Sequence, residues 1–391
     1  MSSAPTFVQR ERAKAVSWKQ STQTLPDGAR HPAPYIRGGQ AQTGPLPFCL
    51  PIEHAALSLL PEVRPMALDL FAELGIPWHA GIGGGPGNHL LSSQVQCVNA
   101  LGQMVHDPDR IVRAFGSVLD IDEVLEVEPG RFLTFEYIGP TDFFGEVPDG
   151  ERTRGARCTS VDAAFLFRSS TGERELALVE WKYTESYRPR KPEPAKDEIR
   201  RKRYRTALHD PDGAVHADVL PFKALLDEPI YQLVRQQLLA WELEKARVHD
   251  VDRVRIVHVI PSDNLAYGDS LSAEHRTVGD TVHEVWHALL RRPDRFLSLD
   301  SSVFADPSIT SPEYVDRYGD VLAWDEDELL RLCGGDIEAL VYDEVQFSGN
   351  VTILQDGLRL WLVDSNAATN VDYPFTLTEL AKACDDVEES S

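Results

Sequence analysis

The chain lacks any long apolar run. Its 391 residues contain no stretch approaching the ~18 uninterrupted apolar residues of a membrane-spanning helix. The first twenty residues, MSSAPTFVQRERAKAVSWKQ, also lack the apolar core of a secretory signal peptide. We therefore expect a cytoplasmic protein that has no membrane partner.

Cysteine is scarce and irregularly placed. There are five cysteines, an odd number with no CxxC pair among them. This pattern argues against a disulfide framework and against a zinc knuckle, and it favours reduced thiols. The cysteines are Cys49, Cys97, Cys158, Cys333 and Cys384.

Positive charge is also in short supply. The formal net charge is −23 at pH 7, which argues against general affinity for nucleic acids. Residues 188–205 are a local exception, with nine Lys or Arg against three Asp or Glu. Such a run is most often a solvated helix or loop face. This one, however, directly follows an apolar segment that we expect to be a core strand.

What is present is the composition of a globular protein, with 42% hydrophobic and 26% charged residues, enough for an ample core. Residues 1–50, rich in Pro, Gly, Gln and Ser, predict an extended or flexible segment. Residues 51–300 predict the main domain. Residues 301–391 predict a C-terminal extension with an acidic tail.

Hydrophobic periodicity predicts an alternating order of helices and strands. Two helices, 53–74 and 89–105, come first, and the turn SSTGE joins two of the strands that follow as a hairpin. The expected strands are 131–139, 159–167, 174–184 and 252–261, with strand-like pieces at 337–345 and 351–364. The later expected helices are 228–248, 280–291 and 325–332.

The segment LALVEWKYTE places charges at the end of an apolar strand. Glu180 and Lys182 are two residues apart and leave the same face of the strand. Asp162 lies in the hairpin partner, where it can sit beside Glu180. Two close carboxylates repel each other, and a divalent cation such as Mg²⁺ removes that repulsion. The two carboxylates, a bound cation and Lys182 would together supply the groups needed for metal-dependent phosphodiester hydrolysis. The simpler alternative is a structural ion pair of Lys182 with Glu180 or Asp162 at the rim of the sheet.

The order helix, strand, strand, strand, helix, strand with this D…ExK pattern resembles the PD-(D/E)XK nuclease superfamily. The segments NHLLSSQVQCVN, FLTFEYIG, GARCTSVDAAF, LALVEWKYTESY and PIYQLVRQQLLA are similar to an uncharacterised bacterial group of restriction-endonuclease-like proteins. The resemblance implies an α/β fold with an αβββαβ core, a central mixed sheet flanked by helices. An N-terminal helical cover and a C-terminal α+β extension would complete the chain.

The resemblance also implies a function and its residues. Asp162 and Glu180 match the metal-binding acids, Lys182 matches the catalytic lysine, and the Trp181 carbonyl would be a further ligand for Mg²⁺ or Mn²⁺. The substrate would be DNA, and the activity would belong to bacterial defence. The protein partner would be a second copy of the chain, in a homodimer, or another defence subunit. The basic run would then contact DNA phosphates through Arg200, Arg201, Lys202 and Arg203.

One departure from the family pattern concerns the first core helix. Many members carry an acid there, but residues 89–105 contain no Asp or Glu. Glu136 is our substitute candidate, with a structural role as the alternative. Glu185 could assist through water, with a solvated loop acid as the alternative, and Gln232 could face the site from the second core helix. Gln94 and Asn99 are candidate polar supports, with a surface or capping role as the alternative.

A rival motif lies at VHEVWH. It contains HExxH, in which His283 and His287 would bind zinc on one helix face with Glu284 as general base. A zinc peptidase would need a third ligand, for which Glu313 and Glu326 are candidates. Amphipathic packing of the helix is the alternative. A third class is a nuclease fold without catalysis, used as a DNA-binding module.

Overall fold

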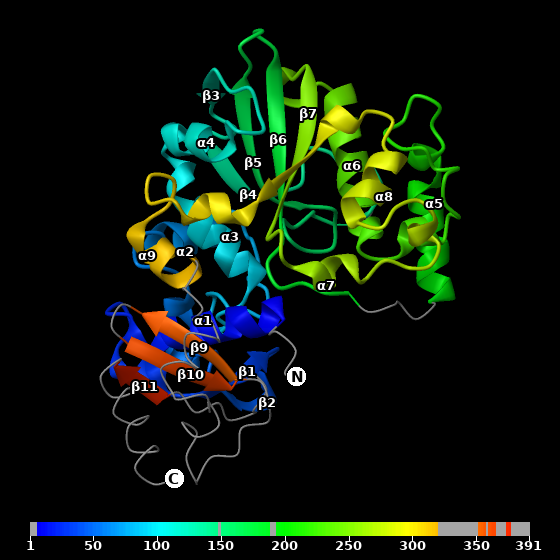
Figure 1. Ribbon diagram of the computed structural model, residues 1–391. Helices are drawn as coiled ribbons and strands as arrows, with labels where there is room; N and C mark the ends of the chain where they lie inside the picture. The colour runs from blue at the N-terminus through cyan, green and yellow to red at the C-terminus, as the bar shows by residue number, and fades with distance from the viewer. Residues whose placement is uncertain are drawn as a thin grey trace. The chain divides into compact units, whose positions relative to one another are not determined.

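The computed structural model describes residues 6–147, 150–187, 193–319, 351–356, 359–364 and 373–376. Within it the chain divides into two compact units (Figure 1). Unit 1 comprises residues 1–61, 80–92 and 312–391, and unit 2 comprises residues 62–79 and 93–311. The main-domain segment that we expected, 51–300, corresponds most nearly to unit 2, but residues 51–61 and 80–92 belong to unit 1, and unit 2 extends to residue 311.

Unit 2 is built on a mixed six-stranded sheet with the order β3-β5-β6-β7-β8, in which β4 also pairs with β5. Pairing with β5 is antiparallel throughout, whereas β6, β7 and β8 run parallel. This arrangement is compatible with a restriction-endonuclease-like fold. The strands are β3 (Glu123–Leu125), β4 (Leu133–Tyr137), β5 (Val161–Arg168), β6 (Arg174–Trp181), β7 (Arg253–Ile260) and β8 (Phe296–Asp300).

The predicted hairpin is confirmed. β5 and β6 pair from Arg168 opposite Arg174 to Ala163 opposite Val179. The turn between them is closed by backbone hydrogen bonds and contains Gly172 at φ +85°, a conformation that glycine adopts without strain. Both faces of this hairpin are buried, which explains its nearly continuous apolar sequence.

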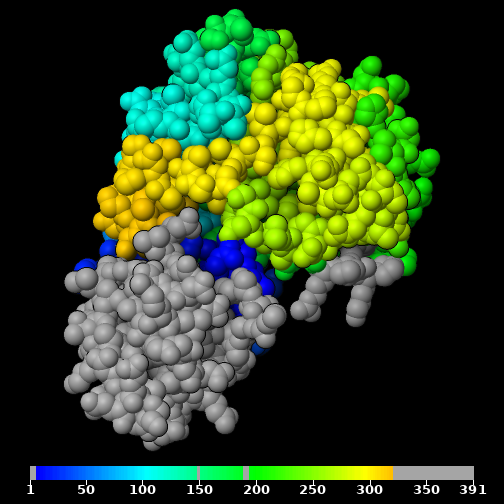
Figure 2. Space-filling view, viewed as in Figure 1, coloured from blue at the N-terminus to red at the C-terminus, as the bar shows by residue number. Residues whose placement is uncertain are grey.

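Helices cover both faces of the sheet. Leu176 and Leu178 pack in one cluster with apolar residues of α5, α6 and α8, which lie to the right of the sheet in Figure 1. On the other face, Phe165 of β5 contacts Phe115 of α4, with ring centroids 4.8 Å apart. In Figure 2 the chain that follows β7, yellow-green to yellow, forms a large part of the visible surface of unit 2. The helices of unit 2 are α2 (Arg64–Glu73), α3 (Ser93–Leu101), α4 (Pro108–Phe115), α5 (Pro194–Leu208), α6 (Ile230–Lys245), α7 (Leu265–Gly268) and α8 (Val282–Leu289).

Unit 1 joins segments that are far apart in sequence. The Lys19 ammonium is fully buried and donates to the carbonyls of His31, Pro47 and Cys49 at 2.8–2.9 Å. Arg317 donates to the carbonyls of Ser58 and Leu90. Buried cations that satisfy loop carbonyls therefore stabilise this unit. Its elements are α1 (Phe7–Ser21), β1 (Ala33–Arg37), β2 (Gln40–Leu46), α9 (Pro312–Tyr318), β9 (Val351–Asp356), β10 (Arg359–Asp364) and β11 (Tyr373–Thr376).

The N-terminal expectations differ most from the structure. Residues 1–50, expected to be extended or flexible, contain α1 and the β1–β2 pair. The expected helix 53–74 is a 3₁₀ turn at Ile52–Ser58 followed by α2, because Pro61 disfavours helical backbone in the residue before it. The expected helix 89–105 begins only at Ser93, since residues 80–92 pack in unit 1, where His89 pairs with Cys49.

The C-terminal expectations are tested only in part. The strand-like segment 351–364 forms β9 and β10, which pair antiparallel. The expected helix 325–332 and the expected strand 337–345 lie outside the described residues. Among the helices that the structure does describe, none has the length and apolar character needed to cross a bilayer.

The hairpin core gives a test of the fold. Leu178 is fully buried between β6 and the helices on its face. We expect Leu178→Ala to lower the free energy of unfolding by about 2–5 kcal/mol, because it removes buried methyl groups and leaves a cavity. Leu265→Ala is the control, since Leu265 is 74% exposed. Urea unfolding that gave equal losses for the two variants would contradict this packing.

Candidate active site

Three carboxylates occupy neighbouring positions on three adjacent strands of unit 2. The β5–β6 pairing ends at Ala163 opposite Val179, so the same register continued by one residue brings Asp162 beside Glu180, and the Asp162 carboxylate contacts the amide of the next residue, Trp181. The β4–β5 register brackets the same position with Phe135 opposite Ala163 and Tyr137 opposite Val161, so Glu136 lies on the other side of Asp162. The predicted proximity of Asp162 and Glu180 is therefore a feature of the sheet itself.

Lys182 extends the same face just beyond the end of β6. Its ammonium donates to Glu180 and, at 2.8 Å, to the side-chain carbonyl of Gln232 on α6. Both Lys182 and Glu180 are buried. Burial alone would lower the pKa of Lys182, but the Glu180 carboxylate and the nearby Tyr187 and Tyr267 raise it well above its ordinary value. Lys182 is therefore a cation whose position at the edge of the carboxylate cluster is fixed by hydrogen bonds to Glu180 and Gln232.

Asp162 is attached to the backbone of the neighbouring strand. Its Oδ2 accepts a hydrogen bond of 2.7 Å from the amide of Trp181. Burial, followed by repulsion from Glu180 and Glu136, raises the pKa of Asp162 well above its usual range. The Trp181 carbonyl accepts from Ser93 Oγ at 3.3 Å, and the indole donates to Gln96, so α3 supports this end of β6.

Glu136 is held in a strained backbone position, with φ +47° in the middle of β4. Its carboxylate accepts from Ser160 at 2.9 Å and from Gln94 at 3.1 Å. A side chain at Gly155 would collide with the Glu136 carboxyl carbon. Burial is the main cause that raises the pKa of Glu136, and Glu180 adds to it. Glu136 therefore belongs to the carboxylate cluster, and Gln94 supports it as expected.

Two further candidates take different positions. Gln232 contacts Lys182 directly and also accepts from the Tyr187 hydroxyl at 3.1 Å. Glu185 accepts from the amide of Tyr183 at 2.6 Å, so its carboxylate is engaged at the start of the loop after β6. Asn99 is buried on α3. Gln232 thus faces the site, whereas Glu185 is attached to its own loop.

The four basic candidates on α5 fall into two groups. Arg201 and Lys202 are exposed and pair with Glu198 one turn away. Arg200 and Arg203 instead line a cavity together with residues of α6 and of the loop before β5. The charge run thus has a solvated side and a side that faces the cavity, so Arg200 and Arg203 remain the candidates for phosphate contact, whereas the charges of Arg201 and Lys202 are met within the helix. Residues 188–192 of the run lie outside the described residues.

The HExxH motif has a structural explanation. Glu284 closes a capping box at the start of α8, where its carboxylate accepts from the amides of Asp280 and Thr281. His287 is exposed, and His283 contacts the buried His258 at 3.2 Å. Of the proposed third ligands, Glu313 begins α9 in unit 1, and Glu326 lies outside the described residues. The capping role leaves Glu284 without the freedom that a general base needs.

The acids have the right chemistry for a hard divalent cation, although they are held by hydrogen bonds within the chain. Carboxylate and carbonyl oxygens are the ligands that Mg²⁺ and Mn²⁺ prefer. Within the described ranges, no three His, Cys, Asp or Glu side chains are grouped closely enough to hold a metal ion. Burial is the main cause that raises the pKa of Asp162, and repulsion from Glu180 and Glu136 adds to it. A bound cation would relieve that repulsion.

Comparison with known proteins identifies the family of the chain. A family model described as "Restriction Endonuclease associating with ARP" matches residues 12–319. The chain belongs to this family. The match extends over both the hairpin and the helices around it, and membership in a restriction endonuclease family points to a nuclease that acts on DNA. No curated protein and no solved structure matches the chain.

Two residues that contact the candidate active site, Gln236 and Ser160, were not predicted from the sequence. Gln236 donates to Glu180 from α6, one helical turn after Gln232, and Ser160 donates to Glu136. The spacing of four residues between the two glutamines was an available signal, because it places both on one helix face. Ser160, in the loop before β5, had no such signal.

The raised pKa of Asp162 predicts a change in stability. Well below pH 4, near which an ordinary Asp titrates, the carboxyl is protonated in folded and unfolded chains alike. Above it, the unfolded chain ionises first, so the folded state loses stability as the pH rises. We expect Asp162→Asn, which keeps an acceptor for the Trp181 amide, to melt several degrees higher than the wild type at pH 8 in EDTA.

That gain should shrink towards zero as the pH falls below about 4. Thermal melting followed by circular dichroism across this range provides the measurement. Asp212→Asn, at an exposed position, is the matched control. A lower melting temperature for Asp162→Asn at pH 8 would show that the ionised carboxylate stabilises the metal-free protein.

Proposed function

We propose that this chain is a metal-dependent endonuclease of the PD-(D/E)XK type that hydrolyses phosphodiester bonds of DNA. The observation that carries the proposal is that Asp162, Glu180 and Lys182 share one face at the end of the core hairpin. Family membership supports nuclease activity. We place this activity in bacterial defence by restriction of foreign DNA.

Each residue has a role in this proposal. Asp162, Glu180 and the Trp181 carbonyl would hold Mg²⁺ or Mn²⁺, with Glu136 as the neighbouring acid. The ion would supply Lewis acidity at the scissile phosphate and lower the pKa of water. Lys182 holds a positive charge where negative charge develops on the phosphate, and Gln232 and Gln236 orient Lys182 and Glu180.

A catalytically inactive DNA-binding module is less well supported. A module that only binds DNA has no use for three acids beside a buried lysine, because burying such charges costs several kcal/mol per ion unless they are paired. The structure keeps Asp162, Glu180 and Lys182 in contact or in register and supports them from α3 and α6. This arrangement favours catalysis.

Metal dependence is the first test. Purified protein should cleave DNA with Mg²⁺ or Mn²⁺ and should lose cleavage when EDTA is added, because the acids need a cation to bind the phosphate. Gel assays on plasmid, linear duplex, single-stranded DNA and RNA identify the substrate. Undiminished cleavage in EDTA would reject the metal-dependent mechanism, and cleavage of RNA alone would reject DNA as the substrate.

The lysine gives the second test. We expect Lys182→Gln to reduce the cleavage rate by about 10²–10⁴-fold, because it removes the charge and keeps a side chain of similar length. Lys223→Gln, at an exposed position, is the charge-matched control. Melting curves establish that both variants are folded. A folded Lys182→Gln variant with wild-type cleavage would exclude the lysine from catalysis.

A further inference from the structure

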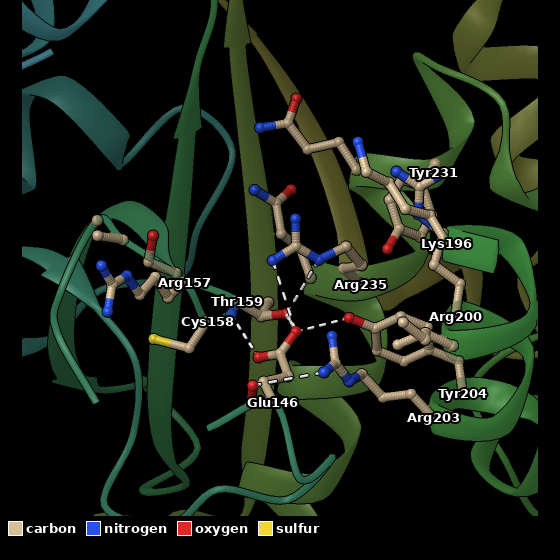
Figure 3. Close-up of a pocket in the computed structure, with 16 residues that line it drawn as sticks. Glu146, Arg157, Cys158, Thr159, Lys196, Arg200, Arg203, Tyr204, Tyr231 and Arg235 are labelled. Atoms are coloured by element: carbon tan, nitrogen blue, oxygen red, sulfur yellow. Dashed lines mark hydrogen bonds and ion pairs between the residues drawn. The ribbon is translucent and has the colours of Figure 1, made fainter. Parts of the chain in front are cut away.

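A cavity of about 510 Å³ lies beside the carboxylate cluster and is lined by sixteen residues (Figure 3). Five of them are basic and one, Glu146, is acidic. This is the reverse of the charge balance of the whole chain, which is −23. The basic residues are Arg157, Lys196, Arg200, Arg203 and Arg235.

Glu146 organises the cavity wall. Its carboxylate accepts from the Thr159 hydroxyl at 2.8 Å and from the Tyr204 hydroxyl at 2.6 Å, and it lies 3.6 Å from Arg235. The Arg235 Nε also donates to Thr159. Figure 3 shows these contacts converging on Glu146 in the middle of the view. The single acid thus fixes one arginine and a tyrosine of the wall.

Tyr231 positions two of the guanidinium groups. Arg200 and Arg235 lie 4.9 Å and 5.6 Å from the centroid of its ring. Arg200 also pairs with Asp197, while Arg203 donates to the Glu146 backbone carbonyl at 3.4 Å. Because these contacts restrain the side chains before any ligand arrives, little side-chain entropy is left to lose on binding.

α5 presents its cations to the cavity along one stripe. Lys196, Arg200 and Arg203 are spaced by four and three residues, which places them on one face of the helix. Arg201 and Lys202 face away and pair with Glu198. The same helix therefore provides cavity residues and a matched set of outward cations.

The cavity adjoins the candidate active site through shared residues. Gln232 and Gln236 both line the cavity. Gln232 accepts a hydrogen bond from Lys182, and Gln236 donates one to Glu180. Ser160 lines it as well and donates to Glu136. A group bound in the cavity is thus one side chain away from the carboxylate cluster.

We propose that this cavity binds a phosphate group of the nucleic-acid strand next to the scissile phosphate, through Arg200, Arg203 and Arg235. This inference rests on the proposed nuclease function and adds a strand-positioning site to it. Guanidinium groups match phosphate oxygens in charge and geometry. A phosphate held here would fix the position of the strand relative to Asp162 and Lys182.

The test compares two double variants of α5 that each remove two positive charges. Binding of fluorescent DNA duplexes and single strands is measured by anisotropy in EDTA over a range of salt concentrations, so that cleavage does not contribute. We expect Arg200→Gln/Arg203→Gln to weaken binding about tenfold and to reduce the salt slope by about one. Arg201→Gln/Lys202→Gln should change affinity by less than about threefold.

Melting curves establish that both double variants are folded. Equal losses in the two variants, no loss in either, or no DNA binding by the wild type would overturn the proposal. Inorganic phosphate and a nucleoside monophosphate serve as competitors at matched ionic strength. If either bound as tightly as the oligonucleotide, the cavity would be a small-anion site and not a strand site.

The outcome is separable from that of the nuclease proposal. A wild type that cleaves DNA while the Arg200→Gln/Arg203→Gln variant binds normally rejects the cavity site alone. A wild type that never cleaves, with binding lost selectively in that variant, rejects the enzyme and keeps the strand site. The Lys182→Gln variant should retain DNA binding in EDTA, since its change lies outside the cavity lining.

Discussion

The contact between Lys182 and Glu180 is the constraint on which unit 2 depends. Both groups are buried at the end of a central strand, where an unpaired charge would cost several kcal/mol. The pair is made tolerable by Gln232 and Gln236, which reach it from α6. The position of α6 over the sheet is therefore set by polar contacts at one end as well as by apolar packing along its length.

One face of the hairpin contributes both to the hydrophobic core and to the candidate active site. Leu176 and Leu178 pack in the core, and two residues further along the same face Glu180 begins the polar cluster. α6 follows the same division, with leucines and valine packed in the core cluster and two glutamines near its beginning directed at the acids. Because core and site share the same elements, the acids are held by a scaffold that cannot shift without disturbing packing.

The proximity of Asp162, Glu180 and Lys182 could be predicted from the sequence, because a strand alternates its side chains with a period of two and a tight hairpin leaves little freedom of register. Glu136 was harder, since its place depends on a local positive φ that no periodicity reports. The cavity could not be foreseen at all. It combines Glu146, Arg203 and Arg235, which lie on three separate segments, and only tertiary structure brings them together. HExxH shows the reverse case, in which a local motif had a local use as a helix cap.

The proposed function requires an acidic chain to approach a polyanion, and the placement of its charges bears on how it could do so. The net charge of −23 repels nucleic acid from most of the surface, so attraction has to come from a confined set of cations. In the cavity, Glu146 reduces the local positive charge and in return orders Arg235 and Tyr204. A restrained arginine loses less entropy when it meets a phosphate than a free surface lysine does. In the proposed function, a few fixed guanidinium groups beside the acids would therefore do more to position a strand than exposed cations such as Arg201 and Lys202, whose charge is already met by Glu198.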